Sequence, residues 1–336
     1  MYDYTLPMRK VCIAFTPAHP SEIPNASFSN LDHVEQEYYQ MILVSFFMFR
    51  KNNPEILLEL VTTHVPQKEF RYFLDFLNVK INLVPFTFKP PVNFYRNYGF
   101  SFYLLDAIKI NQNFDTLYVD PDVLCLKNLA TLFDSLDNRL AGINCEYPMD
   151  FEINGLTRRK GLDVALMIDS ESSIYPHIGG EILFVPKLYG SKVVSGLNDT
   201  FTQNLSFFSQ GLDYFTTEEH LISFCLRDQI VIELNSFAKR VWTRFRYNNV
   251  DRTERDMYLL HFPAEKQFGF KKLFHLLQKD LKGMESLNDE YLKEFILDEF
   301  LFKNLFLKKF LAKIFSLIIV LKRLLRKLLN SLRSGL

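Results

Sequence analysis

Cysteine is scarce in this sequence, and its placement argues against two common kinds of structural site. Only four cysteines occur among 336 residues. No two of them form a C-x-x-C pair, and none lies near histidines at the spacing of zinc ligands, which argues against a zinc site. Three of the four lie within apolar runs, so we expect buried free thiols in a reducing compartment rather than disulfides. The four are Cys12, Cys125, Cys145 and Cys225.

Long hydrophobic runs are also missing, and we expect no N-terminal signal in this sequence. Residues 1–10 include Asp3 and Pro7, and the apolar stretch from Val11 to Phe15 is too short for the hydrophobic region of a signal peptide. We therefore expect the body of the protein to be cytoplasmic. Hydrophobic residues make up 48 % of the chain and charged residues 23 %, which excludes a disordered or fibrous protein.

A net charge of zero hides two oppositely charged parts of the chain. Residues 303–336 carry nine Lys or Arg and no acidic residue, so their formal charge is +9. The rest of the chain has 30 basic and 39 acidic residues and therefore carries −9. Such asymmetry indicates an anionic partner for the C-terminal segment. The nine basic residues are Lys303, Lys308, Lys309, Lys313, Lys322, Arg323, Arg326, Lys327 and Arg333.

The same segment repeats apolar residues at helical spacing from Leu301 to Leu332. Its longest uncharged run, Ile314 to Leu321, has eight residues, whereas a membrane-spanning helix needs about 20. The pattern predicts a basic amphipathic helix that lies in an anionic membrane surface. Two alternatives stay open, because the helix could instead pack on the body or pair with a helix of a partner. Nucleic acid is disfavoured, since no recognised binding module accompanies the basic residues.

Strand-like and helix-like segments alternate over residues 11–119. This alternation predicts an α/β fold, with a doubly wound parallel sheet flanked by helices. Ligands bind beyond the carboxyl ends of the strands in such sheets, so Thr16, at the end of the first strand, is a candidate contact for a nucleotide. The expected strands are 11–16, 56–62, 79–85 and 116–119, and the expected helices are 31–50, 68–77 and 98–110.

The pattern of the chain changes after residue 140. Residues 150–173 show no clear period, and we expect them to be irregular. The chain from about residue 288 onward is expected to be helical. Further strands are expected at 140–144, 180–185, 230–234 and 257–262, with a helix at 218–227.

The most informative run is FDTLYVDPDVLCLKNLATLF, at residues 114–133. An apolar strand delivers Asp120 and Asp122 at its carboxyl end, and two carboxylates at this spacing can converge on one divalent cation. Oxygen ligands of this kind suit Mg²⁺ or Mn²⁺. Such a cation can bridge two phosphates of a nucleotide-sugar and neutralise the charge of a leaving diphosphate. The structural alternative is an aspartate that only caps the next helix.

The run LYVDPDVLCLKNLATLF resembles glycosyltransferase family 8 and the related bacterial enzymes that build lipopolysaccharide or capsule. Two further blocks are similar in order and spacing, IGGEILFVP at 178–186 and LLHFPAEK at 259–266. The resemblance covers about residues 10–270. It implies a GT-A catalytic domain over 1–285, with a mixed sheet flanked by helices, followed by the helical tail 286–336. It also implies a divalent metal, a nucleotide-sugar donor such as a UDP-sugar, and retention of the donor's anomeric configuration.

The same resemblance assigns candidate residues to the donor side of the site. His261 would be the third metal ligand beside Asp120 and Asp122. Lys266 would approach the diphosphate, where a point charge suffices. Arg96, which precedes a predicted helix, would lie near the nucleotide.

A further block, FTTEEHLISFCL at residues 215–226, resembles a family segment at the start of a helix. Glu218 or Glu219 would then lie near the acceptor hydroxyl or the anomeric carbon. Acidic residues in the first turn of a helix also interact favourably with the helix dipole, and that structural role is sufficient by itself. The chain departs from the family pattern at Ile178, where an asparagine is usual, and at Ala264, where a glycine is usual.

These features predict a peripheral enzyme on the inner face of the cytoplasmic membrane, which transfers a sugar to a saccharide or lipid-linked acceptor of the lipopolysaccharide or capsule type. The main rival is a non-catalytic, membrane-associated binding protein with the same fold, which the departures at Ile178 and Ala264 keep open. A nucleotidyltransferase is disfavoured, because the loop TPAHPSEIP at 16–24 lacks the glycines that such enzymes usually have after the first strand.

Overall fold

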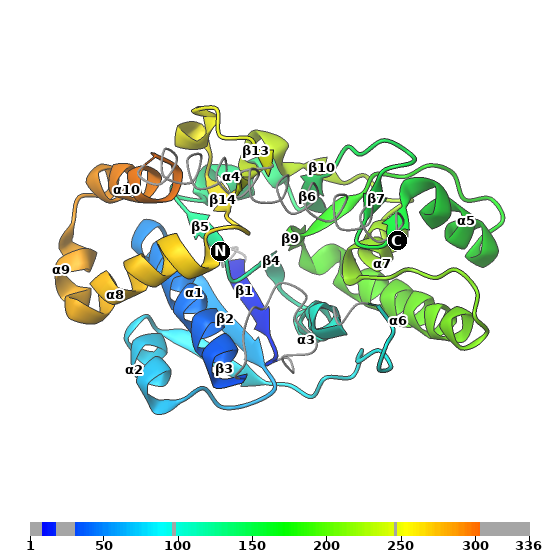
Figure 1. Cartoon of the computed structure of the whole chain (residues 1–336), viewed down its shortest axis with the longest axis horizontal. Helices are drawn as coiled ribbons and strands as arrows, with labels where there is room; N and C mark the ends of the chain where they lie inside the picture. The colour runs from blue at the N-terminus through cyan, green and yellow to red at the C-terminus, as the bar shows by residue number, and fades with distance from the viewer. Residues whose placement is uncertain (1–8, 18–30, 96–98, 245–246, 303–336) are drawn as a thin grey trace, which may run out of the picture.

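The structure, a computed structural model, describes residues 9–17, 31–95, 99–244 and 247–302. Its centre is a seven-stranded sheet in the order β10-β6-β9-β4-β1-β2-β3 (Figure 1). The first four strands of this sheet along the chain pair in parallel, as their alternation with helices predicts. β9 is antiparallel to both β4 and β6, so the sheet is mixed. The strands are β1 (Arg9–Phe15), β2 (Leu57–Thr62), β3 (Val79–Leu83), β4 (Asp115–Val119), β6 (Ala141–Asn144), β9 (Ile178–Val185) and β10 (Ile232–Glu233).

Side chains alternate between the two faces of this sheet, and each face carries a hydrophobic core. In β4, Leu117 and Val119 belong to one core and Tyr118 to the other, and in β9 Ile182 and Leu183 divide in the same way. The first core is covered by α1 (Leu31–Asn52), α2 (Lys68–Phe76), α4 (Ala130–Leu136), α8 (Lys271–Lys279) and α10 (Asp289–Leu297). The second is covered by α3 (Tyr103–Ile110), α5 (Arg158–Ile168), α6 (Lys187–Ser209) and α7 (Glu218–Cys225).

A smaller sheet lies beyond the carboxyl end of β4 and has the order β11-β14-β5 (Figure 1). Its strands are β5 (Val123–Cys125), β11 (Ala238–Arg240) and β14 (Leu259–His261). β14 is antiparallel to β5 and parallel to β11. Because β5 begins just after β4 ends, this sheet brings β14 and β11 to the same edge of the central sheet, although they lie far away in the sequence.

The prediction that residues 150–173 are irregular is wrong. They contain the hairpin of β7 (Glu152–Ile153) and β8 (Leu156–Thr157), followed by α5. The hairpin turns at Asn154 and Gly155, which both have positive φ, and the Thr157 hydroxyl caps α5 by accepting a hydrogen bond from the Lys160 N–H. Because the helix buries only a few apolar residues, its sequence has no strong hydrophobic period.

The C-terminal residues that the structure describes pack on the body. Leu292 and Ile296 of α10 and Phe300 and Leu301 after it all lie in the first core. The predicted amphipathic helix falls on residues 303–336, which lie outside the described residues. Within the described part of the chain, no helix is long and apolar enough to cross a membrane.

All four cysteines are free, as the sequence predicts. Three of them are buried, whereas Cys225 is half-buried. The remaining short elements are the hairpin of β12 (Thr243–Arg244) and β13 (Tyr247–Asn248) and the helix α9 (Leu281–Ser286). There are also the 3₁₀-helices η2 (Gly99–Phe102), η3 (Leu234–Ser236) and η4 (Thr253–Asp256) and the π-helices η5 (Lys266–Phe270) and η6 (Asp298–Phe302).

Candidate metal and catalytic site

A short turn after β4 carries Asp120 and Asp122 into β5. Three hydrogen bonds hold this turn. The Asp120 N–H donates to the Glu181 carbonyl at 2.9 Å, and the Val123 N–H donates to the Asp120 carbonyl at 3.1 Å. From α1, the Ser45 hydroxyl donates to the Val123 carbonyl at 2.7 Å. Both aspartates therefore project from a well-anchored turn at the carboxyl end of a central strand.

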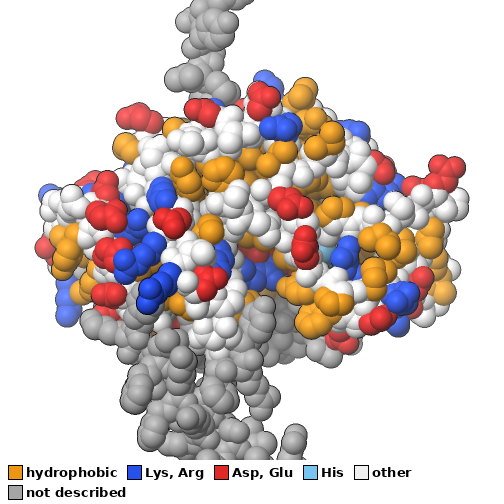
Figure 2. All heavy atoms as spheres, turned by 90° about the horizontal axis from the view of Figure 1, so that it is seen from above, with side chains coloured by type: hydrophobic (Ala, Val, Ile, Leu, Met, Phe, Trp, Pro, Cys, Tyr) orange, Lys and Arg blue, Asp and Glu red, His pale blue; other side chains and the backbone are white. Residues whose placement is uncertain are grey.

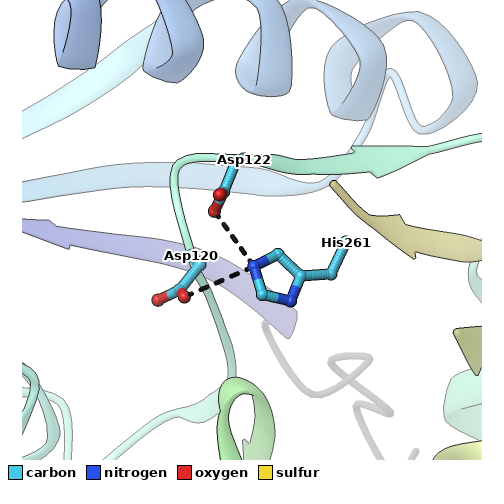
Figure 3. A group of neighbouring side chains, drawn as sticks. All are labelled: Asp120, Asp122 and His261. Carbon is cyan, nitrogen blue, oxygen red and sulfur yellow. Dashed lines mark ion pairs between the residues drawn. The ribbon is translucent and has the colours of Figure 1, made fainter. Parts of the chain in front are cut away.

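β14 places His261 opposite this turn. His261 pairs with Val123 in the antiparallel ladder of β14 and β5, and the Phe262 N–H donates to the Asp122 carbonyl at 3.0 Å. Figure 3 shows the carboxylates of Asp120 and Asp122 facing the same ring nitrogen. His261 Nε2 lies 3.2 Å from an Asp122 oxygen and 3.8 Å from an Asp120 oxygen. One ligand atom from each of the three residues lies within 4.8 Å of the other two.

These three side chains fit a divalent cation. The Asp122 side chain is 1 % exposed, and among the described residues its two carboxylate oxygens face the charged side chains of His261 and Lys266. The Asp120 side chain is 47 % exposed, so the cluster opens to solvent on that side. Two carboxylates and one imidazole are a suitable donor set for Mg²⁺ or Mn²⁺. The cluster could therefore hold a metal ion, with a side open to a ligand.

Two basic side chains balance the aspartates in the structure as it stands. Lys266 Nζ lies 2.9 Å from the Asp122 oxygen that faces away from His261. Burial alone would raise the pKa of Asp122, but Lys266 and His261 hold it well below its usual range. Burial would likewise lower the pKa of His261, but Asp122 and Glu181 raise it to about 9. Partial burial and the neighbouring Asp122 carboxylate raise the pKa of Asp120 to about 6. A bound cation would take over this balancing of charge.

A buried ion pair lies behind His261 and joins β9 to β11. Glu181 has a side chain that is 1 % exposed, and Arg240 donates to both of its oxygens at 2.6 Å, from Nε and from a terminal nitrogen. One Glu181 oxygen also lies 3.7 Å from His261 Nδ1. Burial would raise the pKa of Glu181, but Arg240 and His261 hold it well below its usual range. An ionised carboxylate therefore backs the imidazole of the metal cluster.

Two adjacent carboxyl groups, from Glu218 and Glu219, begin α7 at the same edge of the sheet. Glu219 accepts hydrogen bonds from the Gly180 N–H at 3.2 Å and from the Asn154 side-chain amide at 3.1 Å. His177 Nε2 lies 3.4 Å from a Glu219 oxygen. Burial would raise the pKa of Glu219, but His177 and the nearby guanidinium of β11 lower it.

Glu218 has a different environment from its neighbour. It accepts a hydrogen bond from the Ser101 hydroxyl, and burial together with the Glu219 charge raises its pKa to about 8. A Cβ added to Gly180 would lie 3.2 Å from both glutamate side chains, so this glycine leaves room for them against β9. Near neutral pH, Glu219 is ionised and Glu218 is mostly protonated, which suits the two groups to different roles.

The structure brings most of the predicted site residues to the same edge of the central sheet. The metal cluster, Lys266 and the α7 glutamates all lie beyond the carboxyl ends of central strands. Thr16 lies at the end of β1 and is buried, with its hydroxyl 3.0 Å from the hydroxyl of Thr63. Arg96 lies outside the described residues.

Sequence reasoning missed Glu181, Arg240 and His177. One signal was present, because Glu181 is the only charged residue of β9 and all eight residues of that strand are buried. A buried carboxylate must be paired. Arg240 gave no such signal, since its partner lies 59 residues away.

No protein-family model matches this sequence, and no curated protein matches it. Among solved structures, an active-site mutant of LgtC is similar, with a TM-score of 0.51 and 12 % identity over 85 % of this chain and 99 % of that chain. The galactosyltransferase LgtC in complex with donor and acceptor sugar analogs has a TM-score of 0.49 and 11 % identity over 80 % of this chain and 95 % of that chain. The glycosyltransferase GlyE of Streptococcus pneumoniae has a TM-score of 0.48 and 12 % identity over 85 % of this chain and 63 % of that chain.

The likeness to the LgtC mutant shows that this chain has a GT-A-type fold. The resemblance to GT-A glycosyltransferases, inferred from the D-x-D block, is therefore confirmed at the level of the fold. Membership of family 8 stays a prediction.

Proposed function

We propose that this GT-A-fold chain is a divalent-metal-dependent glycosyltransferase. It would transfer a sugar from a nucleotide-sugar donor, such as a UDP-sugar, to a saccharide or lipid-linked acceptor of the lipopolysaccharide or capsule type. The observation that carries the proposal is the convergence of Asp120, Asp122 and His261 beyond the carboxyl end of β4. That edge is where open α/β sheets bind nucleotides.

The donor side of the proposed site consists of the metal cluster and Lys266. Asp120, Asp122 and His261 would hold Mn²⁺ or Mg²⁺, which when bound neutralises the charge on the leaving nucleoside diphosphate. Because the cation would satisfy Asp122, the Lys266 ammonium would be released to contact the same phosphates. Thr16, at the end of the neighbouring β1, would lie near the nucleotide.

The two glutamates of α7 would act on the sugar. Glu219, ionised and fixed by several donors, would face the anomeric carbon, and Glu218 would donate a hydrogen bond to the sugar or the acceptor. An ionised carboxylate beside the anomeric carbon is the arrangement that a double displacement uses. We therefore propose hexosyl transfer with retention of configuration.

The test is a panel of nucleotide-sugars incubated with the purified full chain, first with Mn²⁺ and then with EDTA. We expect one donor to release its nucleoside diphosphate with Mn²⁺ and to release almost none with EDTA, since without the cation the two aspartates would repel the leaving diphosphate. Binding of a donor without any turnover would favour the non-catalytic rival. Absence of metal-dependent binding to every donor would contradict the proposed function.

We also propose that the protein works at the inner face of the cytoplasmic membrane, through an amphipathic helix within residues 303–336. The supporting observations are the charge of +9 in that segment and its helical apolar repeat. Exposed apolar side chains also gather on the side of the molecule that carries α5 (Figure 2), where Phe151, Met167 and Ile174 are exposed. Such a patch suits a lipid-linked acceptor or a lipid surface.

Deleting residues 303–336 should release the protein from membranes. The truncation should spare Phe300 and Leu301, because both are buried in the core. We expect the full chain to sediment with anionic vesicles at low salt and the truncated chain to stay in the supernatant, while both release nucleoside diphosphate from a soluble donor at similar rates. A truncated chain that still sediments would place the anchor elsewhere.

A further inference from the structure

Glu181 and Arg240 form a largely buried ion pair with two hydrogen bonds between the side chains. The Glu181 side chain is 1 % exposed and that of Arg240 is 19 % exposed. The guanidinium meets the carboxylate through two parallel hydrogen bonds of 2.6 Å, which is the most directional form of this interaction. A side chain at Gly179 would collide with the Glu181 carboxyl group, so the glycine leaves the space that the pair occupies.

The pair touches the metal cluster on one side. Glu181 lies 3.7 Å from His261 Nδ1, and Nδ1 has no regular hydrogen-bond partner among the described residues. The other ring nitrogen, Nε2, faces the two aspartates. At 3.7 Å the Glu181 carboxylate acts on the ring through its charge rather than through a hydrogen bond. A negative charge behind a metal-binding histidine favours the proton on the rear nitrogen and strengthens the ligand nitrogen.

The same guanidinium touches the α7 glutamates on the other side. A terminal nitrogen of Arg240 lies 3.5 Å from Glu219 Oε1, and its other terminal nitrogen donates to the Tyr147 hydroxyl at 3.3 Å. Register adds a third link, because Arg240 and His261 are direct partners in the parallel ladder of β11 and β14. A displacement of Arg240 would therefore disturb both the metal cluster, through His261, and the carboxylate of Glu219.

We propose that Glu181 and Arg240 are positioning residues that hold the metal-binding histidine and the Glu219 carboxylate in one fixed relation. This inference rests on the proposed function. Glu181 orients His261 for the cation, and Arg240 fixes both Glu181 and Glu219. Neither residue needs to touch the donor. Without the pair, the metal would bind more weakly even in the absence of donor, and the remaining turnover would be slow.

The test compares three variants of the full chain with a matched control. The variants are Glu181→Gln, Arg240→Lys and the double variant Glu181→Gln/Arg240→Met, in which no buried charge of the pair is left unpaired. The control is Lys239→Met, in the same strand. It breaks a comparable pair, because Lys239 is 15 % exposed and lies 2.7 Å from the fully buried Glu254. Its side-chain partners are Asp251, Thr253 and Glu254, none of which belongs to the candidate site.

Free Mn²⁺ is measured by its electron paramagnetic resonance signal in titrations without donor, and kcat and KM are measured with the donor that the wild type accepts. We expect Mn²⁺ affinity to fall about 10- to 100-fold in all three variants, with a lower kcat at saturating Mn²⁺ and a nearly unchanged donor KM. The control should bind Mn²⁺ as the wild type does. Arg240→Lys should lose less than the double variant, since it keeps the positive charge.

Two outcomes would overturn the inference, and they differ in what they say of the proposed function. If the wild type binds Mn²⁺ and turns over a donor, and the double variant matches the Lys239→Met control in both measurements, then the pair is only structural. If the wild type binds no Mn²⁺, the proposed function fails and the inference fails with it. Circular dichroism of each variant identifies a loss of Mn²⁺ binding that is due to unfolding, and the double variant guards against it because it removes both charges together.

Discussion

Replacing Asp122 by asparagine is expected to abolish metal-dependent turnover, with kcat/KM at least ~10³-fold lower, because a metal that neutralises a leaving group contributes several kcal/mol to the transition state. Asp122 is the most buried of the three candidate ligands. Of the two aspartates it lies closer to His261 Nε2, at 3.2 Å against 3.8 Å for Asp120. Asparagine keeps the shape of the side chain but presents a neutral oxygen. The measurement is release of nucleoside diphosphate at saturating Mn²⁺.

The fold of the Asp122→Asn variant should survive. The substitution preserves volume in a fully buried position, and loss of one of the two carboxylates that raise the pKa of His261 makes it easier for the imidazole to release its proton. The matched control is Asp134→Asn, which removes a carboxylate that is 72 % exposed and pairs with Arg9 on the surface. Exposed pairs of this kind contribute little to stability, so the control should retain full turnover. An active Asp122→Asn variant with normal Mn²⁺ binding would show that the aspartates are structural.

The part of the fold that sequence patterns predicted is the part where local pattern and tertiary environment agree. Strands such as β1, β2 and β4 are short apolar runs buried on both faces, and the helices between them show a helical period, so both could be read from the chain. The failure at 150–173 has the opposite cause. There the hairpin depends on positive φ at Asn154 and Gly155, and α5 depends on a single capping hydroxyl, and neither gives a period.

The residues of the candidate site also differ in whether the local sequence reveals them. Asp120 and Asp122 could be found because both belong to one turn at the end of one strand, and His261 because its block resembles a family motif. The ion pair of Glu181 and Arg240 could not be found, since the two residues come from different sheets and meet only after β9 and β11 are in place. A charged residue in a buried strand indicates that an oppositely charged partner exists, but the sequence does not show which residue that partner is.

The α7 glutamates lead to the second large effect. Glu219→Gln should lower kcat by about 10²- to 10³-fold, the cost of losing one group that stabilises charge in the transition state, and by more if the carboxylate is the nucleophile. Glutamine keeps the shape and the oxygen that accepts from the Gly180 N–H, but it removes the negative charge that His177 and Arg240 stabilise. Because the donor phosphates bind through the metal cluster, the donor KM should change little. Steady-state kinetics at saturating Mn²⁺ separate the two parameters.

Glu218→Gln is the internal control for this prediction. Burial and the neighbouring charge raise the pKa of Glu218 to about 8, so at pH 7 its carboxyl group is mostly neutral and the amide is a close mimic. We expect this variant to keep most of its kcat at pH 7, so that the two adjacent substitutions differ widely although they change the same chemical group. A larger loss for Glu218→Gln than for Glu219→Gln would reverse the two roles. Equal and small losses would mean that both acids serve only to start α7, where the helix dipole alone would favour them.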